Sequence, residues 1–266
     1  MALEHHLDSK LRFTQQVENS EAYVLAFINE TKTIQSGLKV LEIGCGEGGV
    51  LKPCIARECQ CVGVDLDQIR IDIANDYFAN EISQGKVQFI NQDVYEASFV
   101  SQFQNYFDLI ILKDAIEHIP NQEAFIPHLK KILAPSGQLF FGFPPWQMPF
   151  GGHQQLALNK WTSKLPYYHL LPNFLYAGIL KLGGETSGKI GELLEIKSTR
   201  ISIERFERIV KAAGLNIINN RHYLINPIYK YKFGLDARVQ FAFIKAIPFV
   251  RNFLTTCVYY LIQPHK

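Results

Sequence analysis

The residues best suited to chemistry in this sequence are carboxylates that accompany short apolar runs. Glu42 lies within the first such run, and Asp65, Asp93 and Asp114 follow later ones. If these runs are strands of one parallel sheet, their carboxyl ends meet at one edge, where open α/β sheets bind ligands. A single aspartate is most often a solvated surface residue. The four acids together therefore predict a ligand site.

A glycine-rich segment, VLEIGCGEGG at residues 40–49, is the strongest single motif. Gly44, Gly46 and Gly49 match the dinucleotide pattern G-x-G-x-x-G, and Asp65 lies 21 residues beyond Gly44. Glycines at a strand-to-helix turn let a ligand lie against the backbone, where a Cβ would collide. The pattern alone also fits an ordinary tight turn, but its place between a strand and a helix predicts a nucleotide-like ligand.

Charge near this turn narrows the type of ligand. A dinucleotide places its pyrophosphate on free N–H groups at the start of a helix. Glu42 lies just before the turn and Glu47 lies within it, so both carboxylates would repel a pyrophosphate. They favour a ligand that carries a positive amino group and a sulfonium.

The next two acids suit the nucleoside part of such a ligand. Asp65 ends the run VGVD, where a carboxylate can accept hydrogen bonds from two ribose hydroxyls. Asp93 follows the third run and suits an exocyclic adenine amine, with Leu66 and Val94 packing on the faces of the ring.

At these residues the chain resembles the class I S-adenosylmethionine-dependent methyltransferases, in particular small-molecule members such as those that methylate quinones. Residues 42–48 are similar to the family's glycine motif, and residues 114–118, DAIEH, to its block after the fourth strand. Residues 133–139 resemble the turn into the fifth strand, with Ser136 in place of the first of two glycines. The resemblance implies S-adenosyl-L-methionine as cofactor and a sheet of seven strands whose last strand is antiparallel.

The resemblance also implies a set of cofactor-binding residues. The cofactor's amino group would lie near the backbone of Gly44 and Lys113, and the Lys113 side chain is expected to pair with a neighbouring acid. The full set is Glu42, Gly44, Cys45, Gly46, Gly48, Asp65, Leu66, Asp93, Val94, Lys113 and Asp114.

Two histidines are the candidate catalytic residues. Methyl transfer from a sulfonium is an in-line displacement that mainly needs alignment and exclusion of water. An oxygen acceptor also loses a proton, typically to a histidine or a carboxylate. His118 follows the fourth strand and His153 begins the segment after the fifth. The alternative for His118 is a hydrogen bond to the backbone at a helix start. No metal site is expected.

Large apolar groups crowd residues 145–197, which we interpret as an inserted lid. An aromatic lid over a cofactor suits a small hydrophobic acceptor. The alternative is that these side chains form a core of their own. The candidate acceptor-lining residues are Trp146, Phe150, Tyr167 and His169.

The elements that position these residues alternate along the chain from residue 37. Strands are predicted at residues 38–43, 61–64, 86–90, 107–112 and 138–143, and helices at 50–58, 67–82, 95–103 and 122–133. A helix at 203–213 after the N-cap Ser202, and strands at 215–225 and 253–262, follow the lid. The alternation predicts an α/β, Rossmann-like, mostly parallel sheet with helices on both faces.

Four parts of the chain follow from this alternation. They are an N-terminal helical cap at 1–36 with a helix at 11–34, a cofactor-binding core at 37–144, the lid at 145–197, and a C-terminal completion of the core at 198–266 with a basic insertion at 226–250.

Charge is divided unevenly among these parts. The net charge is −8 for residues 1–144 and +9 for residues 197–266. The basic quarter suits a solvated face, an anionic membrane surface or, least well because its charges are scattered, a nucleic acid. No run is apolar enough to span a membrane, and the first twelve residues are unlike a signal peptide. Five cysteines without regular spacing predict buried free thiols in a reducing cytoplasm. Peripheral membrane contact and the oligomeric state stay open.

Four functions remain in view. The first is a methyltransferase for a small, hydrophobic acceptor, with O-methylation favoured. The others are an NAD-linked oxidoreductase, a non-catalytic cofactor-binding protein and an RNA methyltransferase. The oxidoreductase leaves Glu42, Asp93 and residues 114–118 unexplained.

Overall fold

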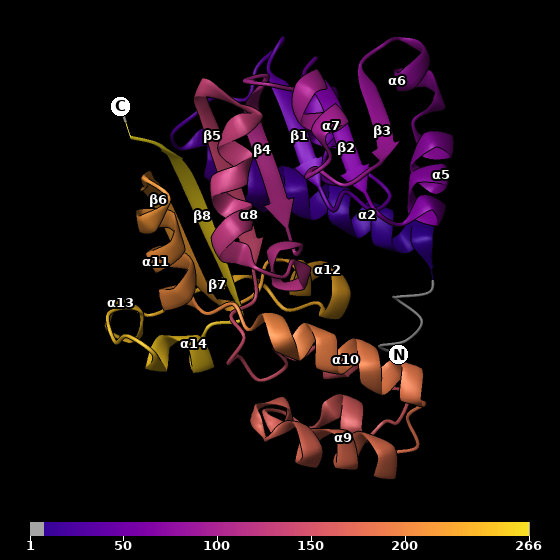
Figure 1. The fold of residues 1–266 in the computed structure, drawn as a ribbon, viewed down its shortest axis with the longest axis vertical. Coiled ribbons are helices and arrows are strands. Elements are labelled where there is room, and N and C mark those ends of the chain that lie inside the picture. The colour runs from indigo at the N-terminus through magenta and orange to yellow at the C-terminus, as the bar shows by residue number, and fades with distance from the viewer. Residues whose placement is uncertain (1–7, 266) are drawn as a thin grey trace.

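The computed structural model describes residues 8–265. Across these residues one sheet runs through the molecule with the strand order β3-β2-β1-β4-β5-β8-β6-β7 (Figure 1). The predicted mostly parallel, Rossmann-like α/β class is confirmed, as is the antiparallel strand next to β5. The strands are β1 (Lys39–Ile43), β2 (Gln60–Asp65), β3 (Val87–Asn91), β4 (Phe107–Lys113), β5 (Leu133–Phe143), β6 (Leu215–Ile225), β7 (Arg238–Val239) and β8 (Cys257–Pro264).

The sheet has eight strands within the described residues, one more than predicted. The extra strand is β7, which is two residues long and lies inside the predicted basic insertion. It pairs with β6 and forms that edge of the sheet. The first residues of the predicted cap, and most of the segment predicted not to be a signal peptide, lie outside residues 8–265.

The central strands are parallel and buried on both faces. β4 lies between β1 and β5, with Leu41 paired to Ile110 and Ile110 to Leu139. Its residues Phe107 and Leu109 to Leu112 are completely buried. A strand covered by helices on both sides has no solvent face, which explains the nearly continuous apolar run.

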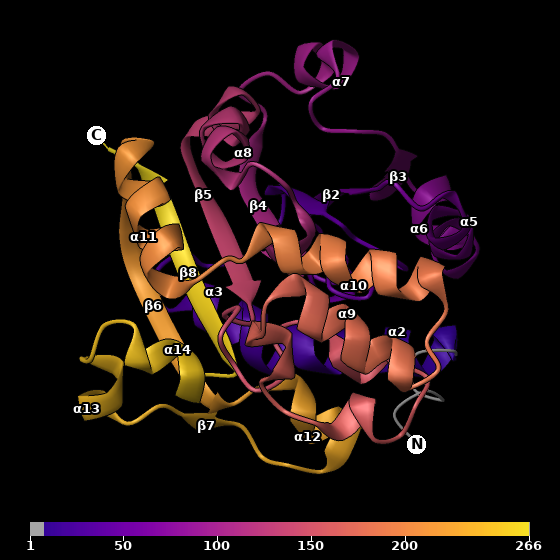
Figure 2. The same ribbon diagram turned by 60° about the horizontal axis from the view of Figure 1, so that its bottom comes forward.

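Helices cover both faces of this sheet (Figures 1 and 2). On one face Phe99, Phe125 and Phe206 join a single core cluster, and on the other Phe27 and Cys54 join a second. The first face carries α7 (Ala97–Gln102), α8 (Gln122–His128) and α11 (Ile203–Ala212); the second carries α2 (Ser9–Asn19), a π-helical turn (Ser20–Val24), α3 (Leu25–Asn29) and α4 (Lys52–Ile55).

Several predicted boundaries are wrong; the strand predicted at 138–143, for example, begins five residues earlier, at Leu133. The helix predicted at 67–82 is two helices, α5 (Gln68–Tyr77) and α6 (Ala79–Ser83), because Phe78 leaves the helical conformation and buries its ring against Phe89. The helix predicted at 50–58 is reduced to α4. The strand predicted at 253–262 begins only at Cys257, because Phe253 and Leu254 still belong to the short helix α14 (Val250–Leu254).

Residues 145–197, the lid segment, lie at the carboxyl ends of the parallel strands (Figure 1). They hold α9 (Asn173–Leu182) and most of α10 (Ser187–Thr199). Tyr168, Tyr176 and Leu193 share a small apolar cluster within the segment. Trp146 N–H donates to the Ile201 carbonyl over 2.8 Å, which joins the lid to the start of α11.

The basic insertion is less regular than the core. It consists of α12 (Ile228–Phe233), β7 and α13 (Ala242–Lys245), and α14 follows it. The Gln15 side chain donates to the Tyr231 carbonyl over 3.1 Å, which ties α12 to α2. All five cysteines are buried free thiols, as predicted. Between residues 8 and 265 no helix combines the length and the apolar character that crossing a membrane requires.

Candidate ligand-binding site at the carboxyl edge of the sheet

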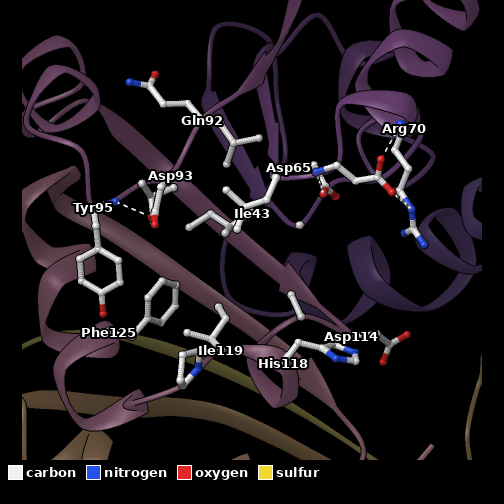
Figure 3. A pocket seen from close by; sticks show the side chains of 17 residues that line it. Ile43, Asp65, Arg70, Gln92, Asp93, Tyr95, Asp114, His118, Ile119 and Phe125 are labelled. Atoms are coloured by element: carbon white, nitrogen blue, oxygen red, sulfur yellow. Dashed lines mark hydrogen bonds and ion pairs between the residues drawn. The ribbon is translucent and has the colours of Figure 1, made fainter. Parts of the chain in front are cut away.

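A pocket of about 630 Å³ opens at the carboxyl ends of β1, β2, β3 and β4 (Figure 3). It collects side chains from four successive strand-to-helix connections. Of the predicted cofactor residues, it is lined by Gly44, Asp65, Leu66, Asp93, Val94 and Asp114. His118 lines it as well.

The glycine turn is built for close approach. Gly44 has φ +73°, and a Cβ there would lie 3.0 Å from the Cβ of Ala115. Gly48 has φ +79°, and a Cβ there would lie 2.7 Å from the Phe89 ring. Gly44 is exposed toward the pocket, whereas residues 45–49 are buried beneath it. The turn is therefore shaped by three residues that do not line the pocket, Cys45, Gly46 and Gly48. Burial raises the pKa of the Cys45 thiol.

Asp65 connects the turn to the end of β2. Its Oδ2 accepts a hydrogen bond from the Gly46 N–H over 2.8 Å, and its Oδ1 accepts one from the Asp67 N–H over 2.9 Å. The side chain is half-buried and lines the pocket. Asp65 thus holds the turn in place and also offers the pocket a carboxylate.

A second group of residues forms the other end of the pocket. Asp93 Oδ1 accepts a hydrogen bond from the Tyr95 N–H over 2.9 Å. Val94 is buried, whereas Leu66 is 73% exposed and has an open apolar face. An acid between two apolar side chains suits a flat heterocycle that carries an amine.

The two acids near the glycine turn have different surroundings. Glu42 is only 2% exposed, and its Oε2 has no hydrogen-bond partner among the described residues. Burial, followed by the charge of Asp65, holds the pKa of Glu42 well above its usual range. Glu47 is instead paired with Arg12 of α2. The prediction that both carboxylates act on a ligand is therefore corrected for Glu47, since its charge is balanced within the protein.

Lys113 and Asp114 form an ion pair at the end of β4, as expected for Lys113. Asp114 has φ +54°, and its N–H donates to the Gly142 carbonyl over 2.7 Å. This backbone turn directs Asp114 into the pocket while the Lys113 side chain stays buried. Asp114 is thus a lining carboxylate with a counter-ion behind it.

His118 and His153 come together although 35 positions separate them in the chain. Their ring centroids are 4.8 Å apart. His118 belongs to a short 3-10 turn at Ile116–His118, and burial lowers its pKa. Glu117, in the same turn, is 5% exposed, and burial raises its pKa to about 8 with a contribution from the charge of Asp114.

The lid residues fit the predictions less well, since none of the four lines the pocket. His169 is completely buried: its Nδ1 lies 3.1 Å from Gln154 Nε2 and its Nε2 lies 2.9 Å from the Trp146 carbonyl. Burial lowers the pKa of His169 to about 4. Trp146 is 8% exposed and packs edge-on against His169. Both residues thus contact each other inside the lid, and their predicted contact with an acceptor stays a prediction.

Phe150 and Tyr167 are half-buried at the edge of the lid. The Tyr167 hydroxyl donates to the Phe253 carbonyl over 3.1 Å, which ties the lid to α14. Their predicted contact with an acceptor stays a prediction.

Several pocket residues were not predicted. Arg70 follows Asp65 by five positions and reaches the glycine turn, where its Nη1 would lie 3.5 Å from a Cβ at Gly46. It also forms an ion pair with Asp67 over 3.4 Å. Its place in the first turn of α5 was the available signal. The other unpredicted lining residues include Gln92, Tyr95, Ile119 and Phe125.

Comparisons with known proteins agree with this geometry. A family model described as "Methyltransferase domain" matches residues 15–220. The ubiquinone biosynthesis O-methyltransferase of Coxiella burnetii is 30% identical over 118 residues, which is 44% of this chain and 47% of that protein. The sterol 24-C-methyltransferase of Debaryomyces hansenii is 29% identical over 123 residues, or 46% of this chain and 31% of that protein. The chain thus spans less than half the length of these relatives.

Solved structures show the same fold at low sequence identity. The phosphoethanolamine N-methyltransferase 2 of Haemonchus contortus superposes with a TM-score of 0.56 at 15% identity, covering 91% of this chain and 52% of that one. The magnesium protoporphyrin IX methyltransferase of Synechocystis gives a TM-score of 0.53 at 15% identity, covering 95% and 84%.

Proposed function

Because the chain belongs to the methyltransferase domain family, we propose that it moves a methyl group from S-adenosylmethionine to a small acceptor. The observation that carries this proposal is the convergence of Gly44, Asp65, Asp93 and Asp114 on one pocket. The family model favours this function over the NAD-linked alternative, and no feature of the pocket requires a nucleic acid.

The residues present fit this cofactor. Leu66 and Val94 offer apolar contacts to an adenine, Asp93 an acceptor for its amine, and Asp65 an acceptor for ribose hydroxyls. The unpaired, buried oxygen of Glu42 lies two residues before Gly44 and suits a positive amino group. Arg70 suits the carboxylate of the methionine part. When bound, the cofactor supplies an activated methyl group on a sulfonium.

The protein itself aligns the two reactants, excludes water from them and removes a proton from the acceptor. The glycine turn and the strand-end acids fix one reactant, so that attack by the other becomes effectively intramolecular. We assign removal of the proton from an acceptor hydroxyl to the pair His118 and His153. Their ring centroids are 4.8 Å apart beside the pocket. O-methylation is the reaction that needs such a pair.

Replacing either histidine by alanine is expected to lower turnover by about 100-fold, because general acid–base groups contribute factors of that order. The affinity for S-adenosylmethionine should change less than about threefold, since the nucleoside is assigned to carboxylates and not to either imidazole ring. Turnover on a panel of phenolic and quinol acceptors, with calorimetry for the cofactor, measures both quantities. His265→Ala is the matched control, because His265 follows β8, contacts Asn216 of β6 and does not line the pocket. Unchanged turnover in both variants would remove the histidines from the reaction.

We further propose that residues 145–197 cover a hydrophobic acceptor and that the outer face of this lid rests on an anionic membrane surface. Trp161 is 87% exposed and Phe174 is 74% exposed. Phe241 and Phe243 of the basic insertion are also exposed and stack on each other with ring centroids 5.6 Å apart. Residues 158–182 contain three lysines and no acid. Aromatic groups among basic residues favour the interface of an anionic bilayer.

Vesicle sedimentation tests this surface. The protein should pellet with vesicles that contain phosphatidylglycerol, and less with pure phosphatidylcholine or at high salt. The double change Trp161→Ser and Phe174→Ser should lower the bound fraction several-fold. Ile69→Ser, which removes a 71% exposed apolar side chain on α5, is the control. Equal sedimentation of all three proteins, or none by the unaltered chain, would contradict a membrane-facing lid.

A further inference from the structure

Three potential metal ligands meet beside the pocket. Glu117 and His118 come from the turn after β4, and His153 comes from the start of the lid segment, where its backbone has φ +52°. One ligand atom from each lies within 4.8 Å of the other two. The three side chains therefore converge from two separate connections of the fold.

Glu117 is the least expected member of this group. It is 5% exposed, and neither carboxylate oxygen has a hydrogen-bond partner among the described residues. The nearby cation Lys113 is committed to Asp114. The turn itself is fixed, since the Thr199 hydroxyl donates to the Glu117 carbonyl over 2.5 Å. A buried carboxylate without a partner is costly, so a cation at this point would satisfy it.

We propose that Glu117, His118 and His153 bind one divalent cation of the zinc type. Two imidazoles and one carboxylate form a ligand set that suits zinc and leaves a fourth position open. A tetrahedral ion would need its ligand atoms about 3.4 Å apart, a small closure from the observed spacing. His118 lines the pocket, so the open position would face the pocket.

This inference deepens the proposed function, and its role in catalysis rests on that function. A cation held here would bind the acceptor's hydroxyl oxygen and lower the pKa of that hydroxyl. The two histidines would then serve as ligands rather than as bases, and the hydroxyl proton would pass to solvent water. Substrates with two neighbouring oxygens, such as catechols, would gain most from an open coordination position.

Cobalt spectroscopy on the full chain tests the site without any turnover. Protein stripped by a chelator is titrated with Co²⁺, whose visible d–d bands report tetrahedral binding, and Zn²⁺ is then titrated against Co²⁺. One equivalent should bind with a micromolar or lower Kd. Glu117→Gln and His153→Ala should each weaken binding by at least about 100-fold. Circular dichroism checks that both variants fold; His153 is only half-buried, so its variant keeps the test valid if Glu117→Gln does not fold.

Two controls separate this site from other ligands in the chain. A His5→Ala, His6→Ala variant removes the adjacent N-terminal histidines and should bind Co²⁺ unchanged. Bands in the near ultraviolet would instead indicate thiolate ligation by Cys54, Cys59 and Cys61, which would overturn the proposal. A lack of stoichiometric binding would also overturn it, as would binding by both variants as tight as that of the unaltered chain.

Calorimetry on the stripped protein keeps the two proposals apart. If S-adenosylmethionine binds but no metal ion does, the proposed function stands and the cation site is overturned. Metal binding without S-adenosylmethionine binding would leave the site intact and contradict the function.

Discussion

Replacing Asp65 by alanine is expected to lower the affinity for S-adenosylmethionine by about 100-fold, or about 2.7 kcal/mol. The change removes the carboxylate assigned to the ribose hydroxyls. It also removes the acceptor for the Gly46 N–H, which lies 2.8 Å from Asp65 Oδ2. The ligand contact and the shape of the glycine turn are therefore lost together.

Isothermal calorimetry with S-adenosylhomocysteine measures this loss without interference from turnover. Asp65→Asn should lose less, because its amide oxygen can still accept one of the two internal hydrogen bonds. Asp72→Ala on α5 is the control, since Asp72 is exposed and does not line the pocket. If Asp65→Ala binds as tightly as the control, the assignment of the ribose to Asp65 is wrong.

Replacing Glu42 by glutamine is expected to have opposite effects on stability and binding. Burial raises the pKa of Glu42, so the free energy of unfolding falls as the pH rises above about 4.5, where the unfolded carboxyl ionises. Glutamine has no such ionisation. The variant should therefore be more stable than the original chain at pH 8, by at least about 1 kcal/mol, with a smaller gain at pH 5. Its affinity for S-adenosylmethionine should fall about tenfold, because the amino group loses its charged partner.

Glu47→Gln is the matched comparison, since it makes the same change five residues after Glu42. Glu47 is buried but paired with Arg12, so its variant should lose about 3 kcal/mol of stability. Urea unfolding at pH 5 and pH 8 separates the two variants. A Glu42→Gln protein that is less stable at both pH values would show that the ionised carboxylate already has an internal partner.

The core of the fold was predictable because its signals are local. Each parallel strand is an apolar run that ends in a turn residue, and strands β1 to β5 each contain most of the predicted run. The strand-end acids were predictable for the same reason: parallel topology brings the ends of successive strands to one edge. Ser202 accepts a hydrogen bond from the Arg205 N–H, as expected of an N-cap.

Pairing between distant residues was not predictable in this way. Arg12 pairs with Glu47 although it lies 35 positions earlier in the chain, and no local sequence pattern predicts this pair. A histidine such as His169 can act as an acid, a base or a metal ligand. Its two ring nitrogens are instead hydrogen-bonded to Gln154 and to the Trp146 carbonyl. The closeness of His118 and His153 likewise depends on how the lid segment returns to the sheet.

The most direct test of the central claim is calorimetric titration of the unaltered chain with S-adenosylmethionine, S-adenosylhomocysteine and NADH. One molecule of either sulfur compound is expected to bind per chain in the micromolar range, and NADH is expected to give no binding heat. A folded chain that binds NADH, or that binds neither sulfur compound, would contradict that claim.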